Sequence, residues 1–241
     1  MIQKPSRFRC LVVGLLFVSL SACATPTRQR ASVPQDPWEG FNRSVFSFNE
    51  GFDRALIKPL AKGYDAIVPT QINTIVTNFF ANIDDLMIAV NDLLQGKFKA
   101  SASDLGRVVL NSTLGIGGLI DVATGMTLEK HEEDFGQTFA RWGLGQGPYV
   151  VLPVFGRSTV LDTFGFAADV PTNPVSWVKL DVVRFSATGL HVVDARADLL
   201  SAEKVVDEGA IDKYSYMRSA YLQRRQYLIY DGNPPREKEE E

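Results

Sequence analysis

Apolar residues recur with the period of an α-helix near the start of the chain. The first set steps along the sequence by four, three, four and four positions, and it comprises Phe41, Val45, Phe48, Phe52 and Leu56. This spacing predicts a helix that Asp36-Pro37 could begin, with one apolar stripe facing the core. Phe46 lies off that stripe, and a large aromatic residue on the other face usually has a second apolar neighbour.

A second helix is predicted over residues 72–83, where Ile72, Ile75, Val76, Phe79, Phe80 and Ile83 repeat the helical pattern. Its other face is polar, and the whole run 66–83 carries no charge. The polar residues of that face are Asn73, Thr74, Thr77, Asn78 and Asn82. A helix that faces water normally carries Lys and Glu, so this face is expected to meet lipid headgroups, a pore or another helix. A buried helix with hydrogen-bonded amides is an equally good interpretation.

Helical patterns continue over residues 85–94, 101–113, 160–168, 177–200 and 208–230. Between Arg141 and Arg157, by contrast, fifteen consecutive residues carry no charge, and glycines and prolines interrupt them. Glycine and proline exclude a helix there, so we expect a loop or a short hairpin. Because loops are usually polar, a segment this apolar must be covered by the protein's own core or by lipid.

The N-terminus has the layout of a bacterial export signal. Lys4, Arg7 and Arg9 precede an apolar run over residues 11–20, and Leu20-Ser21-Ala22-Cys23 follows. The run is too short to span a membrane, which takes about 20 apolar residues. A cysteine after Leu-Ser-Ala resembles the lipobox of bacterial lipoproteins, which implies cleavage before Cys23 and acylation of its thiol. Ala24 as the second mature residue implies sorting to the outer membrane.

The chain is therefore predicted to comprise a signal peptide at 1–22, a lipidated cysteine with a flexible tether at 23–35, one helical domain at 36–231 and a disordered charged tail at 232–241. Removal of the signal takes away three basic residues and no acidic ones, which changes the net charge from −3 to about −6. Nucleic-acid binding depends on basic residues, so this balance argues against it. Cys10 leaves with the signal and Cys23 is blocked by lipid, so no disulfide is expected.

Candidate catalytic groups are scarce in the sequence. There is no Gly-x-Ser-x-Gly motif. The only histidines are His131 and His191, and His131-Glu132-Glu133-Asp134 lacks the spacing of a helical zinc motif. We interpret residues 131–134 as a solvated charge run, with a divalent-ion site as the alternative. Paired carboxylates for cell-wall glycoside cleavage remain possible among 28 acidic residues.

The last predicted helix is rich in aromatic and basic residues, with Tyr214, Tyr216, Tyr221, Tyr227 and Tyr230 among Arg218, Arg224 and Arg225. This combination suits a membrane interface or a protein contact. Ordinary helix packing is at least as good an explanation.

Several longer motifs occur in order along residues 36–162. They are Asp36-Pro37-Trp38-Glu39-Gly40-Phe41-Asn42-Arg43, Phe46, Phe48-Asn49, Asn78-Phe79-Phe80-Ala81-Asn82, Asn91 with Leu94-Gln95-Gly96, Arg107, Asn111, Gly117-Gly118 with Asp121, Asp134-Phe135-Gly136-Gln137-Thr138, and Gly147-Pro148-Tyr149 with Leu152-Pro153. Together they resemble the signature of the MlaA family, also called VacJ. Three positions depart from it: Asp85 and Leu161 stand where proline and arginine are expected, and Arg157 replaces a usual proline.

The resemblance implies a mainly α, ring-shaped helical domain that lies in the inner part of the outer membrane around an amphipathic channel. It implies transport of misplaced phospholipids from the outer leaflet to a periplasmic carrier, in association with a trimeric porin, without enzymatic chemistry or a cofactor. The Gly/Pro-rich segment would be a movable lip of the channel. The candidate channel and gate residues are Phe46, Phe48, Asn49, Phe79, Phe80, Gly143, Gly145, Gly147 and Tyr149. A lipid-anchored envelope hydrolase and a porin-bridging scaffold are the alternative functions.

Overall fold

The computed structural model describes residues 34–235. The predicted signal peptide, Cys23, residues 23–33 of the tether and residues 236–241 of the tail lie outside them. The described part is mainly helical, as predicted. Its elements are α2 (Glu39–Phe52), the π-helix η2 (Asp53–Ile57), α3 (Lys58–Ile67), α4 (Thr70–Leu94), α5 (Phe98–Thr113), α6 (Val122–Gly125), α7 (Phe135–Arg141), β1 (Tyr149–Leu152), β2 (Gly156–Thr159), α8 (Val160–Thr172), the 3-10 helix η3 (Pro174–Trp177), α9 (Asp181–Asp198), α10 (Leu200–Gly209) and α11 (Lys213–Ile229).

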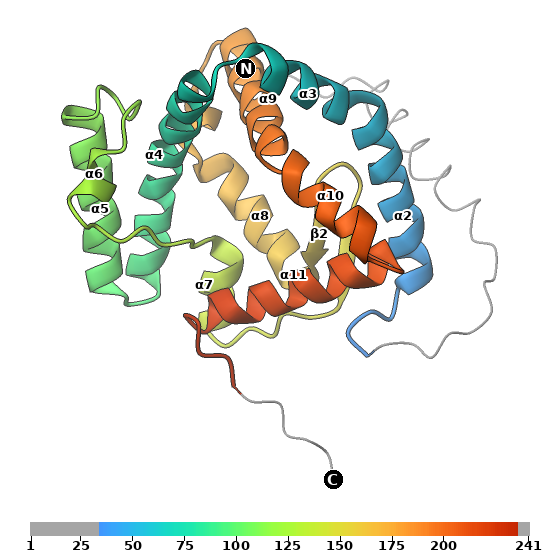
Figure 1. Cartoon of the computed structure of the whole chain (residues 1–241). Coiled ribbons are helices and arrows are strands. Elements are labelled where there is room, and N and C mark those ends of the chain that lie inside the picture. The colour runs from blue at the N-terminus through green and yellow to red at the C-terminus, as the bar shows by residue number, and fades with distance from the viewer. Residues whose placement is uncertain (1–33, 236–241) are drawn as a thin grey trace, which may run out of the picture.

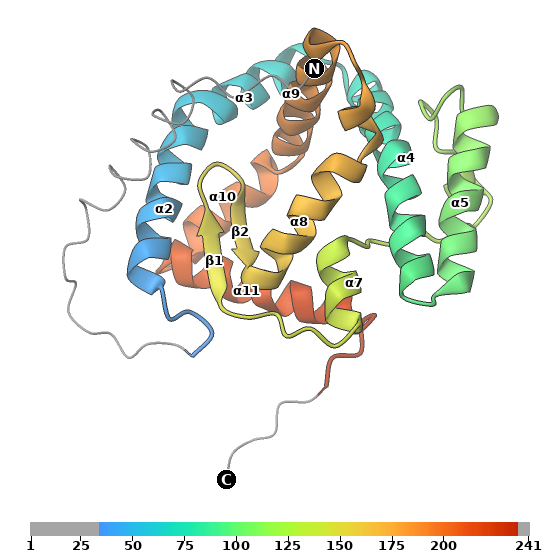
Figure 2. The ribbon, with the colours of Figure 1, turned by 180° about the vertical axis from the view of Figure 1, so that it is seen from behind.

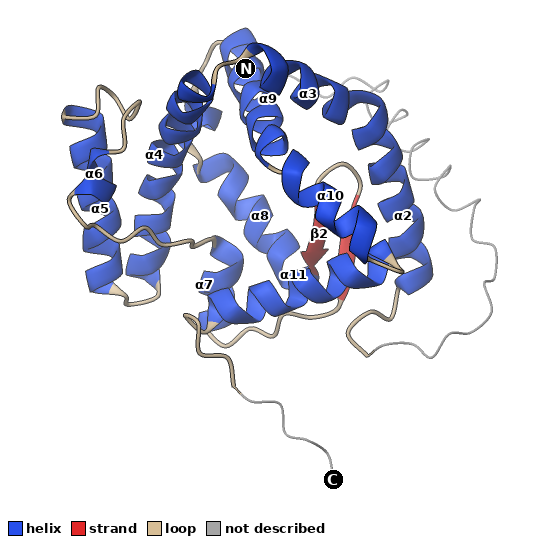
Figure 3. Cartoon of the chain, in the orientation of Figure 1, coloured by secondary structure: helices blue, strands red, loops and turns tan. Residues whose placement is uncertain are grey.

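The helices are arranged as a ring (Figures 1 and 2). On one side, α2, η2 and α3 form a continuous arc, α4 closes the opposite side, and α7 and α11 lie along the base. Within this outline lie α8, the pair α9 and α10, and the two-stranded hairpin, while α5 and α6 pack outside α4. Figure 3 shows that the hairpin is the only sheet of the described residues, and it provides part of the wall inside the ring.

Helix α4 is longer than the sequence predicted. The segments 72–83 and 85–94 were expected to be separate helices, but they form one helix of 25 residues. Neither glycine nor proline interrupts it, and Asp85 is buried within it, where it pairs with Arg107 and Lys130 at 3.2 and 2.6 Å. The helix ends before Gly96, whose φ of +78° lets the chain reverse into α5.

The uncharged polar face of α4 contacts other elements of the protein. Asn73 and Thr77 donate hydrogen bonds to the carboxylate of Asp194 on α9, at 3.1 and 3.0 Å. Asn82 donates to the hydroxyl of Ser112 on α5 at 3.0 Å. The expected contact of this face with another helix is therefore confirmed, and its amides are hydrogen-bonded, but the helix is not buried, because Ile72 and Phe79 are exposed.

The small hydrophobic core lies between α2, the hairpin and α11, where it comprises Val45, Tyr149, Val151 and Tyr214. Phe46 packs against it edge to face, with its ring centroid 5.5 Å from that of Tyr214. The second apolar neighbour expected for Phe46 is thus Tyr214. The prediction that the stripe on α2 faces the core is wrong, because Val45 is buried while Phe41, Phe48 and Leu56 are exposed.

Exposed hydrophobic side chains and buried polar ones are found throughout the described part of the protein. Buried polar and charged side chains outnumber buried hydrophobic ones, whereas large hydrophobic side chains are exposed on nearly every long helix. An apolar stripe therefore does not indicate the core here. Within residues 34–235, no helix is both long enough and apolar enough to cross a membrane.

The Gly/Pro-rich segment forms the antiparallel hairpin of β1 and β2, which confirms the expected short hairpin. Tyr149 pairs with Thr159 and Leu152 with Gly156. Two asparagines of α2 supply the hydrogen bonds that a third strand would make. Asn42 bonds the carbonyl of Tyr149 and the amide of Val151, at 3.0 and 2.9 Å, and Asn49 bonds the carbonyl of Leu152 and the amide of Val154, at 2.9 and 2.7 Å. Because the two asparagines are seven residues apart, they lie on one face of the helix.

Candidate functional site

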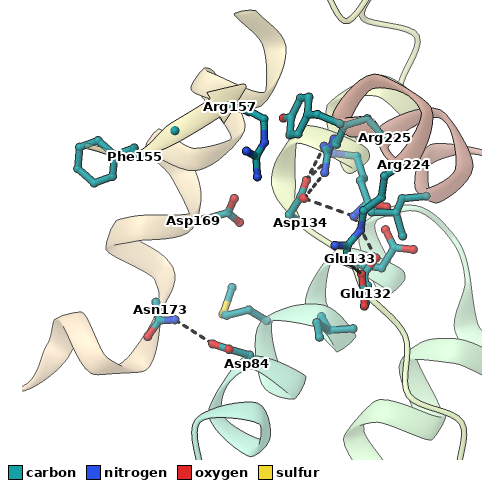
Figure 4. Close-up of a pocket in the computed structure, with 16 residues that line it drawn as sticks. Asp84, Glu132, Glu133, Asp134, Phe155, Arg157, Asp169, Asn173, Arg224 and Arg225 are labelled. Carbon is teal, nitrogen blue, oxygen red and sulfur yellow. Dashed lines mark hydrogen bonds and ion pairs between the residues drawn. The ribbon is translucent and has the colours of Figure 1, made fainter. Parts of the chain in front are cut away.

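Three cavities meet at the turn of the hairpin, and their volumes are about 630, 460 and 260 Å³. Phe155 and Arg157 line all three. The largest of these three cavities lies between α4, the segment that precedes α7, the hairpin, α8 and α11 (Figure 4). The hairpin turn therefore forms a wall that the three cavities share.

The wall of the largest cavity is amphipathic. Met87, Ile88, Phe155 and Leu228 provide apolar surface. The charged residues of the wall are Asp84, Glu132, Glu133, Asp134, Asp169, Arg157, Arg224 and Arg225. A space of this size with both kinds of wall suits a ligand that has an apolar body and a charged end.

Arg225 is the buried centre of the charged wall. Its guanidinium bonds Asp134 at 2.5 and 3.1 Å and Asp162 at 2.5 Å, and Tyr221 donates to the second oxygen of Asp162 at 2.7 Å. Burial alone would raise the pKa of Asp134, but the ion pair with Arg225 and the bond from the amide of Gln137 hold that pKa below its usual value. The guanidinium of Arg225 is thus already bound by Asp134 and Asp162, and these bonds position α7 and α8 against α11.

The guanidinium of Arg157, in contrast, makes no hydrogen bond or ion pair with the rest of residues 34–235. It is exposed on β2, and Figure 4 shows it pointing into the cavity on the same side as Asp169. A cation that points into the cavity, beside apolar wall residues, is suited to bind an anionic group such as a phosphate.

Asp169 lies in the same wall, where it accepts a hydrogen bond from the amide of Phe135 at 3.2 Å. Burial raises the pKa of Asp169 to about 6, because the lowering effect of the bond from Phe135 is smaller than the effect of burial. Its negative charge therefore destabilises the folded protein. The penalty begins as the pH rises above the ordinary aspartate pKa of about 4, is complete above about 6, and is absent in stronger acid, where the group is protonated in both states.

We predict that Asp169→Asn stabilises the protein at pH 7.5 and has little effect at pH 4. The expected gain in the free energy of unfolding at pH 7.5 is about 1 kcal/mol, after allowance for partial solvent screening. The measurement is thermal unfolding of the detergent-solubilised protein across this pH range. Asp65→Asn, at an exposed position of α3, is the matched control and should be close to neutral. A penalty from Asp169→Asn at pH 7.5 would contradict this account.

The structure brings some of the predicted channel residues to these cavities. Phe46 and Asn49 line the cavity of about 460 Å³, and Phe80 lines a smaller one of about 220 Å³, where its ring stacks on His191 with centroids 4.4 Å apart. Phe48 and Phe79 are exposed and line none of these spaces. Tyr149 belongs to the hydrophobic core, where burial raises its pKa to about 12.

The predicted gate glycines lie in the loop between α7 and β1. Gly143 and Gly147 have φ values of +96° and +68°, in the region that favours glycine. Gly145 has no such φ, and a Cβ atom there would meet open space. A Cβ atom on Gly147 would lie 3.1 Å from Cβ of Val160. The three glycines thus have different structural requirements.

The interpretation of residues 131–134 as a solvated charge run is wrong for most of that run. Glu132 alone is exposed, and it pairs with Arg224. Glu133 pairs with Lys97 at 2.6 Å, Asp134 pairs with Arg225, and His131 contacts Asp104 at 2.7 Å. Their partners come from α5, α11 and the turn before α5, so no local spacing in the sequence could reveal them.

Half of the aromatic and basic residues that the sequence singled out on α11 pack within the protein. Tyr214 and Tyr221 contact Tyr149, with ring centroids at 6.3 and 6.0 Å. Arg218 bonds the buried Asp36 at 2.7 Å. Ordinary packing therefore explains Tyr214, Tyr221 and Arg218. Tyr216, Tyr227, Tyr230 and Arg224 are exposed, and for them a membrane interface or a protein contact stays a prediction.

Comparison with known proteins identifies the family. A model of the MlaA lipoprotein family matches residues 34–228. The chain belongs to the MlaA lipoprotein family. The matched residues include the ring of helices and the hairpin, so the described structure shows the MlaA fold.

Characterised and uncharacterised relatives agree with this assignment. The Escherichia coli K12 protein named intermembrane phospholipid transport system lipoprotein MlaA is 32% identical over 234 residues, which cover 94% of this chain and 90% of its own. An uncharacterised protein of Rickettsia bellii is 35% identical over 195 residues, 80% of this chain and 76% of its own. A solved structure, described as the structural basis for maintenance of bacterial outer membrane lipid asymmetry, matches with a TM-score of 0.71 at 32% identity, and the match covers 80% of this chain and 98% of that one.

The most informative wall residues were not among the sequence candidates. One feature of the sequence drew attention to Arg157, because it replaces the proline expected from the MlaA resemblance. Arg225 and Asp134 belonged to noted motifs, but their ion pair joins positions 91 residues apart. Asp169 had no signal in the sequence.

Proposed function

We propose that this protein removes phospholipids misplaced in the outer leaflet of the outer membrane and passes them through the ring to a periplasmic carrier protein. The observation that carries the proposal is the amphipathic cavity beside the hairpin, with the unpaired guanidinium of Arg157 in its wall. A phospholipid has the matching chemistry, since its phosphate needs a cation and its acyl chains need an apolar surface.

The distribution of polarity supports a position within lipid. Many large hydrophobic side chains are exposed around the ring, on α2, α3, α8 and α9, while carboxylates and arginines are buried inside it. Exposed apolar surface on this scale marks contact with a membrane or another protein. In this proposal the outer face of the ring meets the inner leaflet, and a trimeric porin covers part of it.

The compartment follows from the predicted N-terminus and from the names of the relatives. A lipid on Cys23 would anchor the chain in the outer membrane on its periplasmic side. The Escherichia coli relative is named as a lipoprotein of an intermembrane phospholipid transport system. The same role for this chain requires no catalytic group and no cofactor.

A charge reversal at Arg157 tests the role of the cavity. We predict that Arg157→Glu keeps its normal abundance but fails to clear phospholipid from the cell surface, because the cavity then repels the phosphate. Surface phospholipid is measured by labelling intact cells of a strain that lacks the native protein and carries either form. Arg54→Glu is the matched control, since Arg54 is exposed on η2 and lines none of these cavities. Full clearance by Arg157→Glu would contradict the proposal.

Two glycine substitutions separate a moving gate from a static turn. We predict that Gly145→Val leaves abundance normal and raises surface phospholipid, because it restricts a loop without a steric clash. Gly147→Val should instead lower abundance, since strain at a positive φ costs on the order of 1 to 3 kcal/mol. Abundance is measured by quantitative immunoblotting of membranes, and surface phospholipid by the same labelling. Normal clearance by Gly145→Val would show that this loop does not gate transport.

A further inference from the structure

A second cluster of polar side chains lies away from the cavity, between α4 and α5. It comprises Asp92 near the end of α4, Asp104 on α5 and His131 in the segment that precedes α7. One ligand atom from each lies within 4.8 Å of the others. Nδ1 of His131 is 2.7 Å from one oxygen of Asp104, and the amide of His131 donates to the other oxygen at 3.3 Å.

Asp92 is the unexplained member of this cluster. Its exposed fraction is 0%, and neither of its carboxylate oxygens has a hydrogen-bond partner. The nearest basic residue in sequence does not neutralise it, because Lys97 is engaged by Glu133 and Asp231. Buried carboxylates in proteins are nearly always paired, hydrogen-bonded or bound to a metal. No donor of the described residues reaches Asp92, and its carboxylate lies beside that of Asp104, so a cation between the two would neutralise both.

We infer that Asp92, Asp104 and His131 form a binding site for a divalent transition-metal ion of the Zn²⁺ class. Two carboxylate oxygens and one imidazole nitrogen are a donor set that Zn²⁺ accepts, with a water molecule in the fourth position. Ligand atoms of one tetrahedral Zn²⁺ lie roughly 3.3 Å apart, since each bond is about 2.0 Å long. The three side chains need to close by at most about 1.5 Å, which side-chain rotation can supply.

The site has a route for the ion to enter. The side chain of His131 is 30% exposed, while that of Asp104 is fully buried. His131 also lines an open groove of about 910 Å³ between the start of α5 and residues 127–131. An ion arriving from this groove meets the imidazole first and the two buried carboxylates behind it.

A bound ion would join three segments that are distant in sequence. It would fix the α4–α5 pair to the segment that carries Glu133 and Asp134 into the wall of the large cavity. Its role is therefore structural, and it does not depend on the nature of the transported lipid.

Zinc content and stability test the site directly. The full-length protein, extracted in detergent and carrying a tag without histidine, is treated with EDTA, freed of chelator and incubated with Zn²⁺ or with Mg²⁺. We expect close to one Zn²⁺ per chain by elemental mass spectrometry and a rise in Tm of about 5 °C or more, with a much smaller effect of Mg²⁺.

Two variants and one control locate the ion. Asp92→Asn and His131→Gln should lose both the bound zinc and the rise in Tm. In metal-free buffer Asp92→Asn should be at least as stable as the wild type, because it removes an unpaired buried carboxylate. His191→Gln is the matched control and should keep the full response, since His191 stacks on Phe80 and contacts none of the cluster.

Three results would overturn the inference. The first is no zinc on the wild-type protein above the background of the Asp92→Asn variant, which would mean that Asp92 and Asp104 share a proton. The second is a full response in both Asp92→Asn and His131→Gln. The third is loss of zinc only in His191→Gln, which would place the ion at another site.

Discussion

Replacing Arg225 with methionine is expected to remove most of the folded protein from the membrane. The side chain of Arg225 is 8% exposed, and its guanidinium neutralises both Asp134 and Asp162. Methionine would leave these two carboxylates close together without a counter-ion. Breaking a buried ion pair costs about 3 to 5 kcal/mol, and we expect a value near the lower end because the Asp134 side chain is 35% exposed. The whole stability of a domain is typically about 5 to 15 kcal/mol. We therefore expect a large fall in abundance and, for the protein that remains, a much lower unfolding temperature.

The neighbouring arginine is the matched control for this prediction. Arg224 is 66% exposed and pairs with an exposed Glu132. Surface ion pairs contribute at most about 1 kcal/mol, so Arg224→Met should keep nearly normal abundance. Abundance is measured by immunoblotting of membranes, and stability by thermal unfolding in detergent. Equal losses in the two variants would show that the buried pair does not hold the ring together.

Gly165→Ala is expected to have the second largest effect, because α7 and α8 cross at this residue without space for a side chain. A Cβ atom on Gly165 would lie 2.3 Å from the amide nitrogen and 2.6 Å from the Cα atom of Gly136. These are backbone atoms of α7, so no side-chain rotation can relieve the clash and the two helices must separate. Such overpacking costs typically 1 to 3 kcal/mol. Separation would also displace Asp134 and Asp162, so we expect a loss near the upper end of that range.

Gly189→Ala is the control for the glycine prediction. Gly189 lies within α9, and a Cβ atom there would meet nothing within 4 Å. Alanine is the better helix former, so this variant should gain roughly 0.5 to 1 kcal/mol. Thermal unfolding of both variants in one detergent gives the comparison. A Gly165→Ala protein as stable as the Gly189→Ala protein would show that the helix crossing tolerates a side chain.

The sequence predicted most helices of the fold but not which faces they bury. Helical periodicity located α2, α4, α5, α8, α9 and α11, because apolar residues follow the helical period whether they face a core or a lipid. The same ambiguity explains the main error. The stripe with Phe41 and Phe48 is exposed, whereas the polar Asn42 is buried, since it bonds the hairpin. Only tertiary structure distinguishes these cases.

The candidate site was predicted only in part, for a related physical reason. The Gly/Pro-rich segment was expected to be a hairpin or loop near the channel, and its turn does line the cavities. Composition could not predict which of its residues line the cavities. Tyr149 on one strand of the hairpin is in the hydrophobic core, whereas Arg157 on the other strand lines the cavity. The ion pairs of Arg225 and the cluster around Asp92 join residues from three or more elements.

Mass spectrometry of the lipids that remain bound to the purified full-length protein tests the central claim most directly. The account predicts intact phospholipid, with both acyl chains present, on the wild-type protein and on Arg54→Glu, and much less on Arg157→Glu. Absence of phospholipid from the wild-type protein, equal amounts on Arg157→Glu, or lysophospholipid and free fatty acid in place of intact lipid would contradict it. The last of these results would instead identify an envelope hydrolase.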